Sequence, residues 1–154
     1  MFIDSTAQAT IASEPEVVWD WTWDPRNRWF PGAGPVAAIE RVELDELKVG
    51  ATRTVYTADG ATLTETLLEV ERGRRHRYRL TGLRPPFAWL VRAGDATWDY
   101  TGRDGATHVC WTYRFELTSP LAWPLARLVV VWFGVAQRRA LARIAAASVL
   151  EGCA

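Results

Sequence analysis

The sequence is short of several residue types, and each shortage argues against a class of protein. Only two of the 154 residues are cysteines and two are histidines. Cys110 and Cys153 have neither the spacing of a metal site nor that of a disulfide framework, so we expect no metal and no cofactor. Lys48 is the only lysine, and the formal net charge is zero. A nucleic-acid partner is not expected either, since such binders normally carry a clustered positive face.

Long hydrophobic runs are also missing. The N-terminal stretch has neither the basic segment nor the apolar segment of a secretory signal. The most apolar stretch, residues 121–136, is shorter than the roughly 20 residues of a spanning helix. It is interrupted by Pro124 and Gly134 and carries Arg127. These features predict a cytoplasmic protein, and membrane contact is an alternative that the sequence does not favour.

Tryptophan, in contrast, is abundant: the chain has nine. Large aromatic rings fill core volume, but they also line cavities that bind apolar or aromatic ligands. Composition does not decide between these two roles. The length is that of one domain with a sizeable core, so residues 1–154 are expected to form a single domain.

The hydrophobic pattern predicts one strand, two short helices, six further strands and a long helix. The first strand spans residues 2–12. The first helix spans about 14–22, because Ser13 is a good N-cap and Pro15 suits the first turn. Asp24-Pro25 begins a second short turn or helix. Alternating apolar residues between turn signals predict strands over 36–44, 52–57, 62–71, 75–83, 89–101 and 106–117.

The last element is a helix predicted over residues 119–147. Its first half is apolar all round from Leu128 to Ala136, and its second half has a polar side with three arginines. A helix that is apolar all round must be covered on more than one side. We therefore expect the sheet to cover one side, and the short helices, a second subunit or a membrane to cover the rest.

Period-2 alternation assigns one face of each strand to the interior. A change of parity after Leu67 indicates a β-bulge. The pattern does not decide the direction of Arg53. A buried Glu65 is costly unless it is paired or protonated, so it either pairs with Arg53 or His76 or faces solvent. The predicted inner face comprises Leu63, Glu65, Leu67, His76, Tyr78, Leu80, Trp98, Tyr100, Val109, Trp111, Tyr113, Phe115 and Leu117.

Several motifs together resemble the START-related polyketide cyclase/dehydrase superfamily, which has the helix-grip fold of the birch pollen allergen. Residues 11–20, IASEPEVVWD, resemble its opening I-x-A-x-P-E-x-V-W-D. Residues 24–32 resemble the D-P…R-W-x-P-G element that follows, and residues 105–111 resemble the G-T-x-V-x-W exit from a hairpin. The resemblance covers essentially the whole chain.

This resemblance implies an α+β helix-grip fold. In such a fold a seven-stranded curved antiparallel sheet wraps around the long C-terminal helix, with two short helices between strands 1 and 2 and a deep apolar cavity inside. Members of the family bind lipids, hormones or polyketides, and some cyclise aromatic polyketides. The resemblance does not select among these functions.

Three functions compete. The favoured one is a carrier or sensor that binds a hydrophobic, aromatic or polycyclic small molecule in the cavity. The second is a polyketide cyclase or dehydratase, with His76 or Glu65 as the base and Tyr78, Tyr113 or Arg53 as a donor. The third is contact with a membrane or partner, including a homodimer, through the apolar helix. The candidate ligand-binding residues are Trp29, Phe30, Tyr78, Trp98, Tyr100, Trp111, Tyr113, Phe115, Val129, Trp132 and Phe133.

Overall fold

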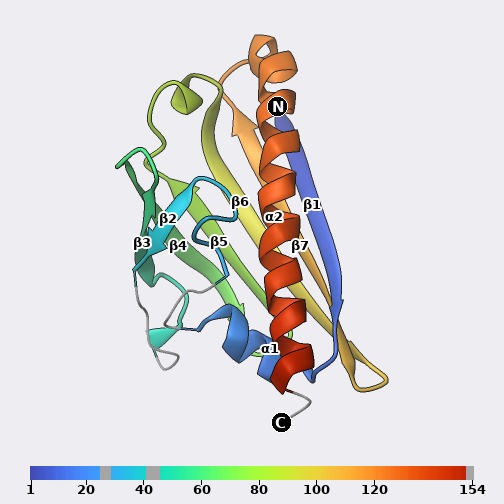
Figure 1. The fold of residues 1–154 in the computed structure, drawn as a ribbon. Helices are drawn as coiled ribbons and strands as arrows, with labels where there is room; N and C mark the ends of the chain where they lie inside the picture. The colour runs from blue at the N-terminus through green and yellow to red at the C-terminus, as the bar shows by residue number, and fades with distance from the viewer. Residues whose placement is uncertain (25–28, 41–45, 152–154) are drawn as a thin grey trace.

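The computed structural model describes residues 1–24, 29–40 and 46–151, and it has the predicted α+β helix-grip architecture. Figure 1 shows the sheet curving around the C-terminal helix. The elements, in chain order, are β1 (Phe2–Ile11), α1 (Pro15–Thr22), β2 (Val36–Ile39), β3 (Thr52–Thr57), β4 (Thr62–Glu71), β5 (Arg75–Thr81), the 3-10 helix η2 (Phe87–Trp89), β6 (Val91–Arg103), β7 (Ala106–Leu117), the 3-10 helix η3 (Pro120–Ala122) and α2 (Trp123–Glu151).

The strands form one antiparallel seven-stranded sheet in the order β1-β7-β6-β5-β4-β3-β2. Strands that follow one another along the chain pair as neighbours, except that β1 pairs with the last strand, β7. The β6–β7 hairpin closes through Asp104 and Gly105, whose φ angles are 54° and 77°. Two consecutive left-handed residues suit the type I′ turn, whose twist matches that of the flanking strands.

The predicted alternation of faces is confirmed on the central strands. The residues predicted to face inward on β5, β6 and β7 are buried. The predicted irregularity in β4 is a register shift between Leu67 and Glu69. On the outer face, arginines pair across strands with acids, for example Arg75 with Asp99 and Arg79 with Asp95. The inner face therefore supplies the core, and the outer face is solvated.

Helix α2 lies along β1 on the concave side of the sheet (Figure 1). It begins at Trp123, four residues later than predicted, because residues 120–122 form η3. The Ser119 hydroxyl caps that turn by accepting a hydrogen bond from the Leu121 amide at 3.1 Å. The side of α2 that faces the sheet carries the buried residues Ala126, Val130, Gln137, Ala140, Leu141, Ile144 and Ser148.

Within the described chain, the first half of α2 is covered on one side only, because α1 does not reach its other side; cover by a second subunit or a membrane stays a prediction. Leu128 is 68% exposed and Trp132 is 54% exposed. The sheet curves past one side of the helix only, and α1 lies near the far, C-terminal end of α2 (Figure 1). The stretch Pro120–Leu150 is long and apolar enough to cross a membrane, and 22% of its most apolar window is buried. The described residues thus leave an apolar face of α2 open.

Two further predicted elements differ from the structure by more than a shift of one or two residues at their ends. The strand predicted over 36–44 is the shorter β2, Val36–Ile39, and residues 41–44 lie outside the described residues. Of the two predicted short helices, α1 is present. The second falls largely on residues 25–28, which are also outside the described part, and residues 29–34 form bends and turns. That non-helical segment forms one wall of the site below.

Candidate functional site

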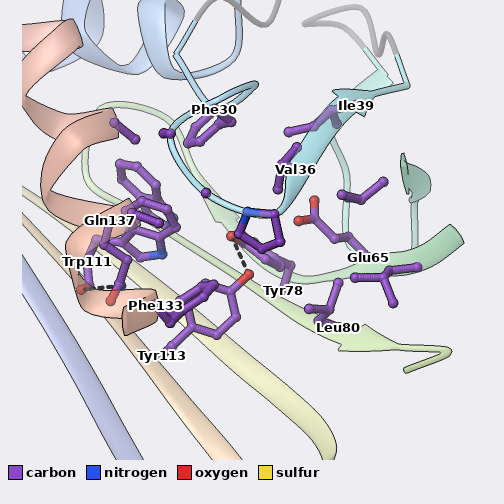
Figure 2. A pocket seen from close by; sticks show the side chains of 18 of the residues that line it. Phe30, Val36, Ile39, Glu65, Tyr78, Leu80, Trp111, Tyr113, Phe133 and Gln137 are labelled. Carbon is purple, nitrogen blue, oxygen red and sulfur yellow. Dashed lines mark hydrogen bonds between the residues drawn. The ribbon is translucent and has the colours of Figure 1, made fainter. Parts of the chain in front are cut away.

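A cavity of about 90 Å³ lies between the sheet and α2. Its lining comes from the end of α1, the segment from Phe30 to Ile39, strands β3 to β7, and the middle of α2. In Figure 2, side chains from these elements point toward one another around the free space. Most of the lining is apolar or aromatic, so the cavity suits an apolar guest.

The segment that forms one wall is fastened to α2. Arg143 donates hydrogen bonds to the carbonyl oxygens of Trp29 and Pro31, at 3.0 and 2.8 Å. Gly34 lies so close to the helix that an added Cβ would be 2.5 Å from the Cβ of Ala136. Glycine therefore permits the close approach that brings this segment against the helix and closes the cavity on that side.

Arg53 and Glu65 form a buried ion pair in the cavity wall. They lie directly opposite each other on β3 and β4. The Arg53 Nε donates a short hydrogen bond to the Glu65 carboxylate, and both side chains are largely buried. The Arg53 guanidinium also lies 4.5 Å from the centre of the Trp23 ring. The pairing predicted for Glu65 is thus present, and the two charges compensate each other.

His76 is almost completely buried and is enclosed by rings. The ring centres of Trp19, Trp23 and Trp98 lie 5.1, 4.8 and 5.4 Å from its own. Its Nδ1 lies 3.4 Å from the Tyr100 hydroxyl. Burial, and secondarily the positive charge of Arg53, lower the pKa of His76 well below its usual value of 6.5. The imidazole is therefore neutral at pH 7.

Tyr78 and Tyr113 place a pair of hydroxyl groups on the cavity wall. The Tyr113 hydroxyl donates to that of Tyr78 at 3.0 Å, and Figure 2 marks this hydrogen bond. Burial raises the pKa of both phenols, and the negative charge of Glu65 raises it further. Both groups therefore stay neutral, and they serve as hydrogen-bond donors and acceptors rather than as anions.

Flat rings on β6, β7 and α2, and that of Phe30, pack against one another in the cavity wall. Trp98 stacks on Trp111 with ring centres 4.3 Å apart. Phe30 meets both indoles edge-on, at 6.2 and 5.9 Å. Phe133 of α2 meets Tyr113 edge-on at 4.9 Å. Such surfaces favour a planar guest, because aromatic groups prefer offset-stacked and edge-to-face contacts.

Nine of the residues predicted for the site line this one cavity. They come from β3 to β7, α2 and the segment before β2, and are Phe30, Arg53, Glu65, His76, Tyr78, Trp98, Trp111, Tyr113 and Phe133. The other five do not line it. Tyr100 is buried beside His76 and Trp19. Phe115 is buried against Phe87 and Phe133.

The three remaining predicted residues also lie elsewhere. The Trp29 indole is buried and donates a 2.6 Å hydrogen bond to the Trp21 carbonyl. Val129 is half-buried outside the cavity lining. Trp132 is more than half exposed and is therefore not a cavity residue. Its position was missed because an all-apolar helical stretch does not indicate which side faces the sheet.

Several lining residues were not predicted from the sequence. Trp23 lies four residues after Trp19, so the helical spacing places both on one face, and this signal could have found it. Ala136 and Ala140 are also four apart and mark the small-residue side of α2 that faces the cavity. Val36 and Ile39 carried no recognisable signal, since their position depends on how the preceding segment packs.

The lining limits the chemistry that the cavity can support. Among the residues that the structure describes, no group of three or more His, Cys, Asp or Glu side chains is placed to hold a metal ion. The described lining contains no serine or cysteine. A neutral imidazole, a compensated ion pair and neutral phenols can hold and orient a guest, and His76 can accept a proton.

Comparison with known proteins agrees with this architecture. The family model described as polyketide cyclase / dehydrase and lipid transport matches residues 3–149. None of the curated proteins matches the chain in sequence.

Solved structures match over nearly the whole chain. The aromatase/cyclase ZhuI from Streptomyces sp. R1128 is 17% identical, with a TM-score of 0.70, 96% of this chain covered and 94% of that one. Protein Ms6760 from Mycobacterium smegmatis is 19% identical, with a TM-score of 0.62 and coverage of 92% and 87%. Ara h 8.0201 is 11% identical, with a TM-score of 0.57 and coverage of 92% and 99%. At such identities the likeness concerns the fold alone.

Proposed function

We propose that this chain, which belongs to the polyketide cyclase / dehydrase and lipid transport family, binds a small, flat, hydrophobic molecule between its sheet and α2. The observation that carries the proposal is the cavity itself, which is walled by stacked and edge-on aromatic rings. The proposed role is that of a carrier or a sensor. Both roles require reversible binding and no chemical step.

The size of the cavity supports a small ligand rather than a large polycyclic one. Its volume is about 90 Å³, whereas sites for drug-sized ligands typically enclose about 300–1,000 Å³. A ligand of one ring or of two fused rings therefore suits the size of the cavity best. A larger ring system would have to displace the wall that Arg143 fastens to α2.

The charges of the residues that line the cavity favour a neutral ligand. Arg53 and Glu65 already compensate each other, and burial keeps His76 and Tyr78 neutral. An anionic or cationic guest would be buried without a free counter-charge among the described lining residues, which is costly.

Titration of the protein with indane and with naphthalene, followed by tryptophan fluorescence, tests the proposal. Several tryptophans line the cavity, so we expect a saturable change in emission. Val36→Phe places extra volume in the cavity and is expected to weaken binding at least tenfold. Val49→Phe makes the same change at an exposed position and serves as the matched control. No saturable response of the wild-type protein to either compound would contradict the proposal.

A second candidate function is a cyclase or dehydratase, and the neutral imidazole of His76 in the cavity wall favours it. His76 would remove a proton next to a carbonyl, and the hydroxyl of Tyr78, which accepts a hydrogen bond from Tyr113, would donate one to the enolate oxygen. A base whose pKa lies well below 7 is a weak one at neutral pH. We therefore place this candidate after binding.

Incubation with a synthetic poly-β-keto thioester, followed by mass spectrometry, tests the second candidate. If this candidate is correct, we expect the wild-type protein to form a dehydrated or cyclised product, and we expect no such product with His76→Gln. His108→Gln, at an exposed histidine, is the matched control. If the product forms no faster with the protein than in buffer alone, the proposed enzymatic function is contradicted.

A further inference from the structure

A group of exposed apolar side chains lies where α2 begins. On the first half of this helix, Leu125, Leu128 and Trp132 are each more than half exposed. They are three and four residues apart, so they lie on one face of the helix. Leu121 of η3, just before that face, is 91% exposed. Large contiguous apolar patches on soluble proteins mark places that meet a partner, a ligand or a membrane.

The 3-10 helix η2 adds a tryptophan at the same end of the molecule, because Trp89 is 71% exposed. Thr118, two residues before η3, ties the two short helices together. Its hydroxyl donates to the Trp89 carbonyl at 2.6 Å, and its amide donates to the Leu90 carbonyl at 3.0 Å. Figure 1 shows both short helices at the end where α2 begins. The surface that we call the apolar end comprises Trp89, Leu121, Leu125, Leu128 and Trp132.

Arginines of α2 flank the apolar end and have no acidic partner. Residues 119–150 include four arginines and no acidic residue. Arg127, Arg138 and Arg139 are exposed, and none of them forms an ion pair within the described chain. The Arg127 guanidinium lies 5.3 Å from the centre of the Trp123 ring. On the outer face of the sheet, in contrast, arginines pair with acids. Uncompensated positive charge therefore lies beside exposed apolar side chains.

We propose that the apolar end docks on the surface of an anionic lipid bilayer. Tryptophan side chains favour the interface between lipid and water. The leucines would bury apolar area at the edge of the acyl chains, and the arginines would be attracted by anionic head groups. A second copy of this chain suits the surface less well, because a symmetric contact through the same face of α2 adds arginines and no acid.

The docking is peripheral, because the other side of α2 belongs to the core. Ala126, Leu141 and Ile144 are almost completely buried, and Arg143 holds the Trp29 carbonyl. A helix that crossed the bilayer would have to leave the sheet and lose these contacts. Docking through the exposed face leaves the sheet, the helix and the cavity in place. The inference therefore does not depend on which ligand the cavity holds.

Cosedimentation with lipid vesicles tests the inference. We expect the protein to pellet with vesicles of equimolar phosphatidylcholine and phosphatidylglycerol, to stay in solution with phosphatidylcholine alone, and to bind more weakly as salt is added. Arg138→Gln/Arg139→Gln should weaken binding at least about tenfold, because two attractive charges are lost. Arg74→Gln/Arg103→Gln removes the same charge at exposed positions next to turns that lie against α1, and is the matched control.

Substitutions of the apolar side chains provide a second readout. Leu128→Ser/Trp132→Ser should weaken vesicle binding at least about tenfold, whereas Val49→Ser, at an exposed position outside the apolar end, should not. Val36→Phe, which fills the cavity, should bind vesicles like the wild-type protein. Equal binding to both kinds of vesicle, binding to neither, or loss of binding by folded Val36→Phe would overturn the inference. A wild-type dimer in sedimentation velocity that Leu128→Ser/Trp132→Ser dissociates would also overturn it.

Discussion

The Arg53–Glu65 pair places two buried charges in a cavity wall that is rich in aromatic rings. A buried pair adds little net stability compared with apolar residues, because both charges lose their hydration. Removal of one partner, in contrast, lowers stability strongly, because the other charge is then left unpaired in an apolar site. The pair is thus a sensitive probe of how well the cavity excludes water.

Glu65→Leu is expected to lower the free energy of unfolding by about 3–5 kcal/mol, because Arg53 would remain buried without its partner. The double variant Arg53→Met/Glu65→Leu should recover most of this loss. Urea denaturation measures both. The exposed pair Arg72–Asp20 is the control, and Asp20→Ala should cost less than about 1 kcal/mol. A loss below that value for Glu65→Leu would mean that Arg53 reaches water.

His76 is expected to make stability depend on pH in a defined direction. Burial lowers its pKa in the folded protein well below 6.5, so below pH 6.5 the unfolded chain binds a proton that the folded protein does not. Stability should therefore be constant above pH 6.5 and fall below it, by up to about 1.4 kcal/mol per pH unit, until the folded-state pKa is reached.

Denaturation between pH 5 and 7 measures this slope. His76→Phe removes the titrating group and should flatten the curve in this interval, apart from the contribution of carboxylates near pH 5. His108→Gln, at an exposed histidine, is the control. Equal slopes for the wild-type protein and His76→Phe would contradict the burial of a neutral imidazole.

At the scale of elements, α2 has two unlike sides although its first half is apolar all round. The side against the sheet is buried, and the opposite side exposes Leu125, Leu128 and Trp132. The sequence predicts the helix from its length and apolar content. It does not predict which side of the helix is buried, because apolar residues that lie all round a helix do not mark any one side. For this reason the sequence predicts Trp132 to lie in the cavity, whereas the structure places it on the exposed side of α2.

Two identical substitutions on α2 should therefore differ sharply. Leu141→Ala empties a buried position and should cost about 2–5 kcal/mol of unfolding free energy. Leu128→Ala removes an exposed side chain and should change it by less than about 0.5 kcal/mol. Thermal or urea denaturation of both variants at micromolar concentration provides the measurement. A large loss for Leu128→Ala would reveal that this face is covered in solution.

At the scale of the whole molecule, much of the fold is predictable because local signals agree with one another. Alternation on β7 gives Trp111 and Tyr113 their inward direction, and turn residues such as Gly105 place the hairpins. The site is less predictable where it depends on packing between distant segments. The approach of Gly34 to Ala136 is one example, since no local pattern indicates it. The volume of the cavity follows from such contacts and not from composition.

The central claim is that the cavity, and not the exposed face of α2, holds the ligand. Intermolecular nuclear Overhauser effects between bound indane and the protein test it directly, because they identify the protons within a few ångströms of the ligand. We expect contacts to Val36, Tyr113 and Phe133, which line the cavity. Contacts confined to Leu128 and Trp132, on the exposed side of α2, would contradict the claim.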